Sequence, residues 1–197
     1  KILLNSASST RKKILISASI KFIQKKPKIN EDDLKSKLIN KNKKPEKICQ
    51  ELAKRKSLSI QKPFFDYYSI GADSCLIFKN TFFSKPKSKK EAEKMFKIIN
   101  GKTHKLYSSV VVSKAGKIIC SYNDFALLKL HKFNNKEIKM YLNKMKIKDI
   151  RASGLYQIEG IGINLFEKIK GDVFAILGLP ILPLLNFFKK EKINVWK

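Results

Sequence analysis

The stretch from Ser6 to Arg11 (SASSTR) carries side chains suited to binding phosphate. Ser6 and Ser8 place two hydroxyls two residues apart, and Arg11 follows where a helix is expected to begin. Hydroxyls and backbone amides bind phosphate oxygens, and an arginine adds a bidentate charged contact. The pattern therefore predicts a triphosphate-binding loop. The structural alternative is an N-cap followed by a solvent-facing arginine.

A second candidate for chemistry is Asp73, a carboxylate within an apolar stretch (IGADSCLIF). Burying an unpaired carboxylate is costly, so Asp73 must meet a cation, a metal ion or hydrogen-bond donors. A carboxylate held in this way is suited to act as a general base or a metal ligand. The alternative is a turn-forming Gly-Ala-Asp at the end of a strand.

Two further side chains could contact a ligand. Lys85 precedes Pro86, which favours an extended backbone, and it could hold a phosphate. The chain has 43 lysines and arginines, so an ordinary solvated lysine is a strong alternative. Glu159 is followed by Gly160 and Gly162, which predicts a tight loop that presents its carboxylate to a ligand, with a plain hairpin as the alternative.

The elements expected around these residues form a mixed fold. An apolar strand at residues 1–5, a loop at 6–10 and a helix at 11–19 would direct backbone N–H groups at a phosphate. Pro45 opens a second helix, and residues 67–78 read as a central strand that contains Asp73. Strands and helices alternate throughout, so the class is α/β or α+β with a mixed sheet.

The remaining elements follow from hydrophobic periodicity. Residues 25–44 are predicted to be exposed, mobile and partly helical. Residues 173–188 are predicted to be a buried strand end and a core helix, because the run is too short for a membrane span and contains two prolines. The other expected helices are 89–99, 134–145 and the one after Pro180, and the other expected strands are 81–83, 104–113, 117–130 and 163–169.

Composition limits the classes of function. With 197 residues and 43% hydrophobic residues, the chain can form one domain with a proper core. The net charge of +27 is mostly lysine scattered along the chain, which favours a solvated surface shaped by codon drift. A functional polyanion-binding surface is the alternative. Neither a signal peptide nor a zinc or redox cysteine motif is visible, so we expect a cytoplasmic protein with three small, buried cysteines, Cys49, Cys75 and Cys120.

Several weak signals become specific when their order is considered, because the chain resembles the Maf family of nucleotide pyrophosphatases. The S-x-S-P-R-R-like motif of that family reads SASSTR here, and its later motifs follow in order. The family motif is given first and the matching residues of this chain follow in parentheses. The motifs are G-A-D (Gly71–Asp73), K-P (Lys85–Pro86), S-G-x-T-H (NGKTH, Asn100–His104), Y-x-I-x-G-x-G (Tyr156–Gly162), G-D (Gly171–Asp172) and V-G-L-P (LGLP, Leu177–Pro180). The resemblance covers the chain from Ile2 to about Lys190.

This resemblance implies a single domain over residues 1–197, with an elongated mixed sheet flanked by helices in two lobes around a central cleft. It implies a hydrolase acting on phosphoric anhydrides, which converts a nucleoside triphosphate to the monophosphate and pyrophosphate with magnesium or manganese. The implied partner is the nucleotide, with no specific nucleic acid and no membrane, and a homodimer is one possible assembly.

The resemblance also implies roles for individual residues. Asp73 would be the general base and would bind the metal together with Glu31. Five side chains would bind substrate: Ser6, Ser8, Arg11, Lys56 and Lys85. Three positions would set base specificity: Thr10, Ser74 and Glu159.

The three specificity positions do not match the pyrimidine-nucleotide enzymes of the family, which have arginine, threonine and glutamine there. Glutamate at the last position is similar to a branch that cleaves 7-methyl-GTP. A carboxylate accepts hydrogen bonds from a base edge with N–H groups, such as that of guanine, which favours a purine or modified base. The alternative function is an inactive, lysine-rich nucleic-acid-binding protein with this fold. The presence of Asp73, Arg11 and Lys85 argues for the enzyme.

Overall fold

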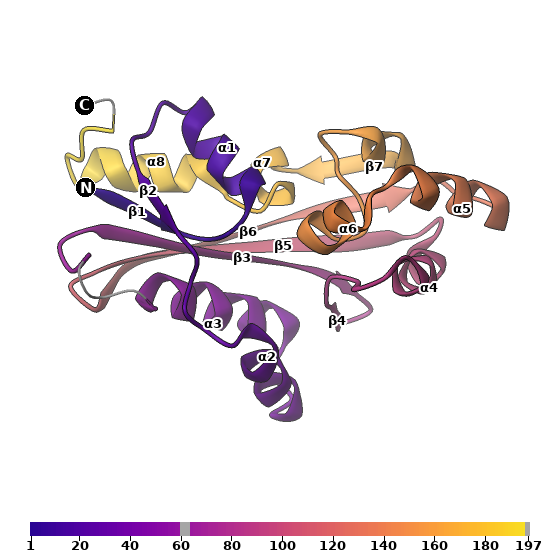
Figure 1. Cartoon of the computed structure of the whole chain (residues 1–197), viewed down its shortest axis with the longest axis horizontal. Coiled ribbons are helices and arrows are strands. Elements are labelled where there is room, and N and C mark those ends of the chain that lie inside the picture. Colours follow the sequence, from indigo (N-terminus) through magenta and orange to yellow (C-terminus); the bar gives the residue numbers. More distant parts are fainter. Residues whose placement is uncertain (60–63, 196–197) are drawn as a thin grey trace. The chain divides into compact units, whose positions relative to one another are not determined.

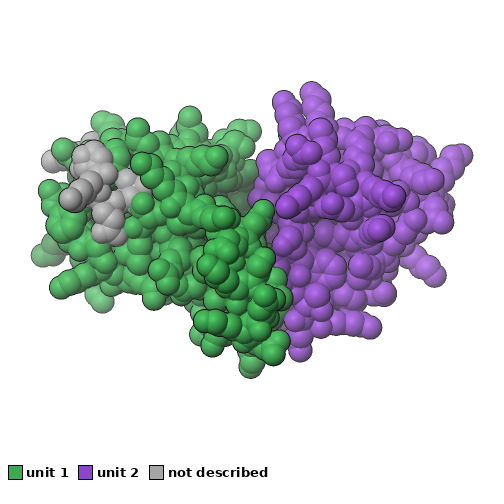
Figure 2. Space-filling view, turned by 60° about the horizontal axis from the view of Figure 1, so that its bottom comes forward, with its two compact units in different colours: residues 1–75, 107–125, 172–197 green, residues 76–106, 126–171 purple. Residues whose placement is uncertain are grey.

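The structure is a computed structural model that describes residues 1–59 and 64–195, and its internal contacts divide the chain into two compact units (Figure 2). Unit 1 comprises residues 1–75, 107–125 and 172–197, and unit 2 comprises residues 76–106 and 126–171. Three strands pass from one unit into the other: β3 (Tyr68–Phe78), β5 (Thr103–Lys114) and β6 (Lys117–Leu130).

The strands form one seven-stranded sheet in the order β2-β1-β3-β5-β6-β7, with β4 paired to β3. The remaining strands are β1 (Ile2–Asn5), β2 (Ile23–Lys25), β4 (Thr81–Phe83) and β7 (Phe166–Gly171). β1 is parallel to β2 and β3, whereas the β3–β4 and β6–β7 pairs are antiparallel. The sheet is therefore mixed, and the expected α/β class with flanking helices is confirmed.

In unit 1, helices cover both faces of the sheet. α1 (Ser9–Ser17), α7 (Val173–Ile176) and α8 (Ile181–Lys190) lie on one side of the strands, and α2 (Glu31–Asn40) and α3 (Pro45–Leu58) lie on the other (Figure 1). Successive side chains of a strand point to opposite faces, so β3 serves both layers. Ile70 and Ala72 enter the apolar core under α1 and α8. Ser69 and Asp73 contact residues of α3.

The α3 layer packs unusually close to the sheet at Gly71. A Cβ atom at this position would lie 2.2 Å from the backbone nitrogen of Ser57 and 2.3 Å from the carbonyl oxygen of Ala53. The Ser57 carbonyl also accepts hydrogen bonds from Ser69 Oγ at 2.6 Å and Ser113 Oγ at 2.8 Å. Strand residues thus hold the C-terminal turn of α3 against β3 at a fixed distance.

Unit 2 has its own core. Phe96, on α4 (Lys89–Ile99), is fully buried and packs edge-on against Phe133 and at a tilt against Tyr141 of α5 (Asn135–Lys144). Asn134 and Glu137 form a capping box that fixes the start of α5. α6 (Ile147–Ser153) and the 3₁₀ helix η1 (Ile161–Leu165) complete the unit.

Most predicted elements are confirmed, and the differences have identifiable causes. α1 begins at Ser9 rather than Arg11 because Ser8 is its N-cap. Residues 173–176 form a helix rather than a strand end because the Asp172 side chain caps it. The strand expected at 163–169 is β7 at 166–171, preceded by η1. β2 and α6 were not predicted.

Cys49 and Cys75 are buried as expected, but Cys120 is only half-buried because it lies in the largely exposed part of β6.

Within the described part of the chain, no helix has the length and apolar character needed to cross a membrane.

The close packing at Gly71 gives a first prediction. Gly71→Ala should lower the free energy of unfolding by about 2 kcal/mol or more, since the new methyl group overlaps backbone atoms that cannot rotate away. Chemical denaturation of the purified variant measures this change. Gly160→Ala is the matched control, because its Cβ would have only ordinary contacts, the nearest at 3.8 Å. Equal stability of the two variants would contradict this account of α3 packing.

Candidate active site

The centre of the candidate site is a buried ion pair between Lys56 of α3 and Asp73 of β3. Lys56 Nζ donates to Asp73 Oδ1 at 2.6 Å and lies 2.8 Å from Glu31 Oε2 at the start of α2. The Lys56 and Asp73 side chains are only 6% and 9% exposed, whereas Glu31 is 36% exposed. One ammonium group therefore holds two carboxylates, and the trio keeps a net negative charge.

This geometry meets the requirement inferred from the sequence for Asp73. A carboxylate in an apolar strand needed a cation, and Lys56 supplies it. Breaking such a pair from one side leaves an uncompensated buried charge, which typically costs about 3–5 kcal/mol. The pairing of Lys56, Asp73 and Glu31 brings together three of the residues that the resemblance had assigned to the site.

The Ser6–Ser8 loop leads from β1 into α1. Ser8 is the N-cap of α1, and its hydroxyl accepts a hydrogen bond from the Arg11 backbone N–H at 3.3 Å. The Ser6 hydroxyl accepts from the Ser8 backbone N–H at 3.2 Å. The N-terminus of a helix is the end that attracts anions, and Ser6 and Ser8 lie there. Residues 6–11 form the predicted phosphate loop.

Arg11 is buried rather than solvent-facing, and its guanidinium contacts three parts of unit 1. Nε donates to the Gly178 carbonyl oxygen at 2.8 Å, Nη1 to Ser6 Oγ at 3.3 Å and Nη2 to Ser74 Oγ at 3.2 Å. The structural alternative was therefore right about the N-cap and wrong about the arginine. Arg11 ties the phosphate loop to β3 and to the turn before α8.

The charge of Arg11 is affected by its surroundings. Burial lowers the pKa of the guanidinium, and the nearby Asp73 carboxylate opposes this change, followed by Cys49 and Glu31. An arginine stays protonated even when its pKa falls by several units, because the starting value is very high. Arg11 therefore remains a fixed cation beneath the phosphate loop.

Two specificity positions were expected in unit 1, Ser74 and Thr10. Ser74 follows Asp73 in β3 and points to the opposite face of the sheet, where it contacts Arg11 rather than Lys56. Thr10 is half-exposed in the first turn of α1. The structure thus separates Ser74 from the carboxylate next to it in the sequence.

Unit 2 holds the two other predicted residues. Lys85 is exposed, and its ammonium group donates to the carbonyl oxygen of Ala152. Glu159 is exposed in the turn before η1. Gly162 fits tightly there, since a Cβ would lie 2.5 Å from the Gln157 carbonyl oxygen, so the predicted tight loop is confirmed.

A neutral histidine holds this loop in place. His104 of β5 is buried, and its Nε2 shares a hydrogen bond of 2.7 Å with the Tyr156 hydroxyl at the start of the loop. Burial lowers the pKa of His104 from 6.5 to about 4, an effect that a backbone hydrogen bond at Lys102 partly opposes. His104 is therefore uncharged near neutral pH.

A metal ion is compatible with the residues present. The described residues contain no cluster of three or more His, Cys, Asp or Glu side chains that could hold one. Magnesium, however, is often bound by one or two carboxylates together with substrate phosphates and water. Asp73 and Glu31 both reach the same ammonium nitrogen, so they are close enough to share one cation.

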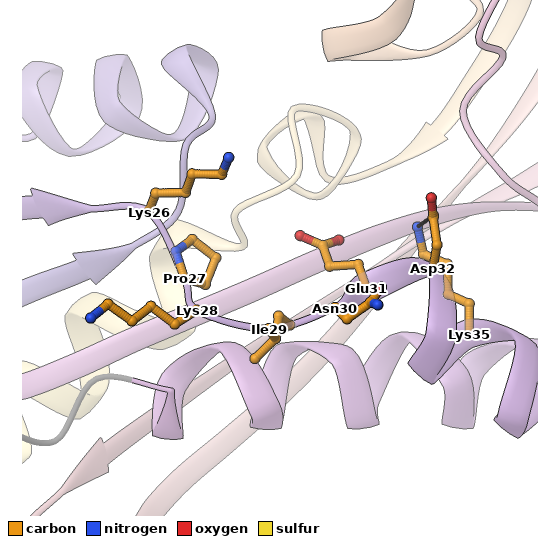
Figure 3. Close-up of a pocket in the computed structure, with 8 residues that line it drawn as sticks. All are labelled: Lys26, Pro27, Lys28, Ile29, Asn30, Glu31, Asp32 and Lys35. Carbon is orange, nitrogen blue, oxygen red and sulfur yellow. Dashed lines mark ion pairs between the residues drawn. The ribbon is translucent and has the colours of Figure 1, made fainter.

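Glu31 also lines an open pocket formed by the segment between β2 and α2 (Figure 3). Its lining includes three lysines, Lys26, Lys28 and Lys35. The lining also includes Asp32 and the apolar Pro27 and Ile29, so the pocket is mixed in character, and it shares Glu31 with the Lys56–Asp73 pair.

Several residues of this arrangement were not predicted from the sequence. Ser108 of β5 contacts Ser74 and Ala175, and Asn5 contacts Ser69. A signal was present, because Asn5 ends an apolar strand and Ser108 lies just before the apolar run Val110–Val112. Buried polar groups require partners, and the same reasoning would have indicated a polar cluster.

Comparison with known proteins identifies the family. A family model described as "Maf-like protein" matches residues 1–191. The chain belongs to the Maf family. The motifs that carried the resemblance therefore occur here as a buried Lys56–Asp73 pair, a loop whose Ser8 caps α1 and a buried Arg11.

Individual relatives cover nearly the whole chain. A protein of Pelagibacter ubique named nucleoside triphosphate pyrophosphatase is 39% identical over 188 residues, which is 95% of this chain and 96% of that protein. Two proteins named 7-methyl-GTP pyrophosphatase are also similar. The Brucella abortus protein is 34% identical, covering 98% of this chain and 96% of its own, and the Bartonella quintana protein is 37% identical, covering 93% and 92%. Maf pyrophosphatases generally depend on a divalent metal ion.

The neutral state of His104 predicts how stability depends on pH. Above pH 6.5 His104 is uncharged in both states of the chain. As the pH falls below 6.5, the unfolded chain binds a proton at this histidine, whereas the folded chain does not until about pH 4. The free energy of unfolding should therefore decrease by about 3 kcal/mol across this window.

Denaturation between pH 7 and 4 checks this prediction against His104→Gln, in which the histidine contribution is absent. His131→Gln is the control, because His131 is the other histidine of the chain and is exposed. If His104→Gln and the unmodified chain lose stability in parallel, His104 is not the group responsible.

Proposed function

We propose that this chain hydrolyses nucleoside triphosphates between the α- and β-phosphates, releasing the monophosphate and pyrophosphate. The observation that supports this best is the buried Asp73 carboxylate, fixed by Lys56 in the same unit as a capped phosphate loop with a buried arginine. A second carboxylate, Glu31, lies 2.8 Å from the same lysine nitrogen. The names of the relatives agree with this chemistry.

Asp73 is the proposed general base. Lys56 contacts Oδ1, which leaves Oδ2 as the oxygen assigned to accept a proton from the attacking water. The hydrogen bond from Lys56 restricts rotation of the carboxylate. Lys56 is thus assigned two tasks, holding Asp73 and contacting the anionic substrate.

Phosphate binding is assigned to the β1–α1 loop. Ser6, Ser8 and the first N–H groups of α1 would contact phosphate oxygens, with the Arg11 cation beneath them. Fixed donors and charges of this kind stabilise the negative charge of the transition state without reorganising. Lys85 of unit 2 is proposed to bind a further phosphate, as the resemblance implies.

Magnesium or manganese is the proposed cofactor, held by Asp73 and Glu31 together with substrate phosphates. When bound, it would neutralise phosphate charge and polarise the reacting phosphoryl group.

The proposed substrate class is purine or modified purine triphosphates, 7-methyl-GTP among them. The support is Glu159, whose carboxylate accepts hydrogen bonds but donates none, as a guanine edge with N–H donors requires. Glu159 is exposed in a tight loop. Two of the relatives carry the name 7-methyl-GTP pyrophosphatase.

The role of Asp73 is tested by Asp73→Asn. The variant should be less stable, because it breaks the Lys56–Asp73 pair from one side, but it should still fold, because Glu31 continues to pair with Lys56. Its kcat should fall by about 10²- to 10⁴-fold with loss of the proton acceptor. Pyrophosphate release is measured over a panel of nucleoside triphosphates with magnesium or manganese. Asp33→Asn, an exposed carboxylate of α2, is the control. A near-normal kcat in Asp73→Asn would overturn the mechanism, and inactivity of the unmodified chain on every substrate would overturn the function.

The role of Glu159 is tested by Glu159→Gln. Glutamine both donates and accepts, which suits a pyrimidine edge, so kcat/KM should shift from guanine-type substrates towards UTP and TTP. The shift should be incomplete, because Thr10 and Ser74 also differ from the pyrimidine type. Glu167→Gln, an exposed carboxylate of β7 that pairs with Lys129, is the control. Identical substrate profiles would show that Glu159 does not read the base.

A further inference from the structure

A chain of hydrogen bonds leads from Arg11 into the interior of unit 1. Arg11 Nη2 donates to Ser74 Oγ at 3.2 Å, and Ser74 Oγ lies 2.9 Å from Ser108 Oγ. Ser108 Oγ lies 2.6 Å from the carbonyl oxygen of Ala175 in α7. Ser108 is fully buried, so its hydroxyl has no access to water.

The proton positions along this chain follow from the chemistry of its ends. The Ala175 carbonyl can only accept, so Ser108 gives it the single hydroxyl proton. Ser74 must then donate to Ser108, which leaves a Ser74 lone pair free to accept from Arg11. Every hydroxyl proton therefore points away from the guanidinium, and hydrogen bonds aligned in this way strengthen one another. The result is an oriented series of dipoles directed at the Arg11 cation.

We infer that Ser108 is a positioning residue for phosphate binding, acting on Arg11 through Ser74. This inference rests on the proposed function, because it assumes that the Ser6–Arg11 loop binds the triphosphate. Ser74 does not lie on the Asp73 face of β3, so its influence on the substrate passes through Arg11. Ser108 sets the direction of the Ser74 hydroxyl and thereby the orientation of the guanidinium.

The turn before α8 supports the same reading. Gly178 has φ of +90°, and a Cβ there would lie 2.7 Å from Ser74 Oγ. Its carbonyl oxygen accepts from Arg11 Nε at 2.8 Å. The backbone thus approaches Ser74 and Arg11 as closely as a glycine permits. Gly178 fixes the guanidinium at Nε, and Ser108 fixes the direction in which the Ser74 hydroxyl points.

A purely structural role for Ser108 is the competing explanation, and a double-mutant cycle separates the two. The variants are Ser108→Ala, Ser74→Ala and the double variant, with Ser109→Ala as the matched control. Ser109 is the next residue of β5, is also fully buried, and its hydroxyl has no hydrogen-bond partner among the described residues. All four changes only remove oxygen atoms, so none introduces a steric overlap.

The expected result is a rise in KM of about tenfold for Ser108→Ala, the equivalent of about one hydrogen bond to a charged group, with kcat changed less than about twofold. Adding Ser108→Ala to Ser74→Ala should raise KM no further, because the connection to Arg11 is already broken. The thermal unfolding temperature should still fall from the single variants to the double variant. KM and thermal stability would then respond differently to the same substitutions.

Binding of an α,β-methylene nucleoside triphosphate, measured by calorimetry, repeats the cycle without turnover. Equal KM and Kd for Ser108→Ala and Ser109→Ala, or additive effects in the double variant, would overturn the inference while the function stands. If the unmodified chain binds the analogue but hydrolyses no triphosphate, the proposed function fails and the Kd cycle still decides the role of Ser108. Failure to bind any triphosphate would overturn both.

Discussion

The rest of unit 1 depends on one interaction, the buried ion pair between Lys56 and Asp73. Two charges with almost no access to water are stable only if their geometry is fixed, because their attraction must offset the loss of hydration. The fixed geometry comes from the backbone: Gly71 lets α3 lie against β3, and the Ser57 carbonyl accepts hydrogen bonds from neighbouring strands. The position of the carboxylate is therefore determined by the packing of a helix on a sheet.

The same strand supports a second polar arrangement on its other face. Ser74 contacts Arg11 there, and Arg11 contacts Ser6 in the loop before α1. In the proposed mechanism, the carboxylate on one face would activate water and the cation on the other would balance phosphate charge. Arg11 and Asp73 affect each other only through space, whereas Lys56 contacts the carboxylate directly at Oδ1.

The sequence predicted much of this site because burial of a charge leaves a clear pattern. Asp73 in an apolar strand required a cation, a metal ion or hydrogen-bond donors, and its partner is the Lys56 ammonium. The small hydroxyl residues after β1 predicted a triphosphate-binding loop, and in the structure they cap α1 and contact Arg11. The burial of Arg11 was not predictable, because its acceptor at Gly178 lies 167 residues away and only the fold brings the two together. Ser108 was missed for a related reason: a serine within an apolar strand shows that a partner exists without showing which one. The short helix at 173–176 was missed because its apolar residues alone do not distinguish a helix from a strand.

The alternation of β3 also makes the spacing of its residues critical. Inserting or deleting one residue between Gly71 and Asp73 would turn the Asp73 carboxylate towards the apolar side chains beneath α1 and α8, and Ser74 towards Lys56. The insertion or deletion of one codon would therefore exchange the environments of the Asp73 carboxylate and the Ser74 hydroxyl at once. A substitution at one of these positions changes one face of β3, whereas a change in the spacing between Gly71 and Asp73 would break both the Lys56–Asp73 contact and the Arg11–Ser74 contact.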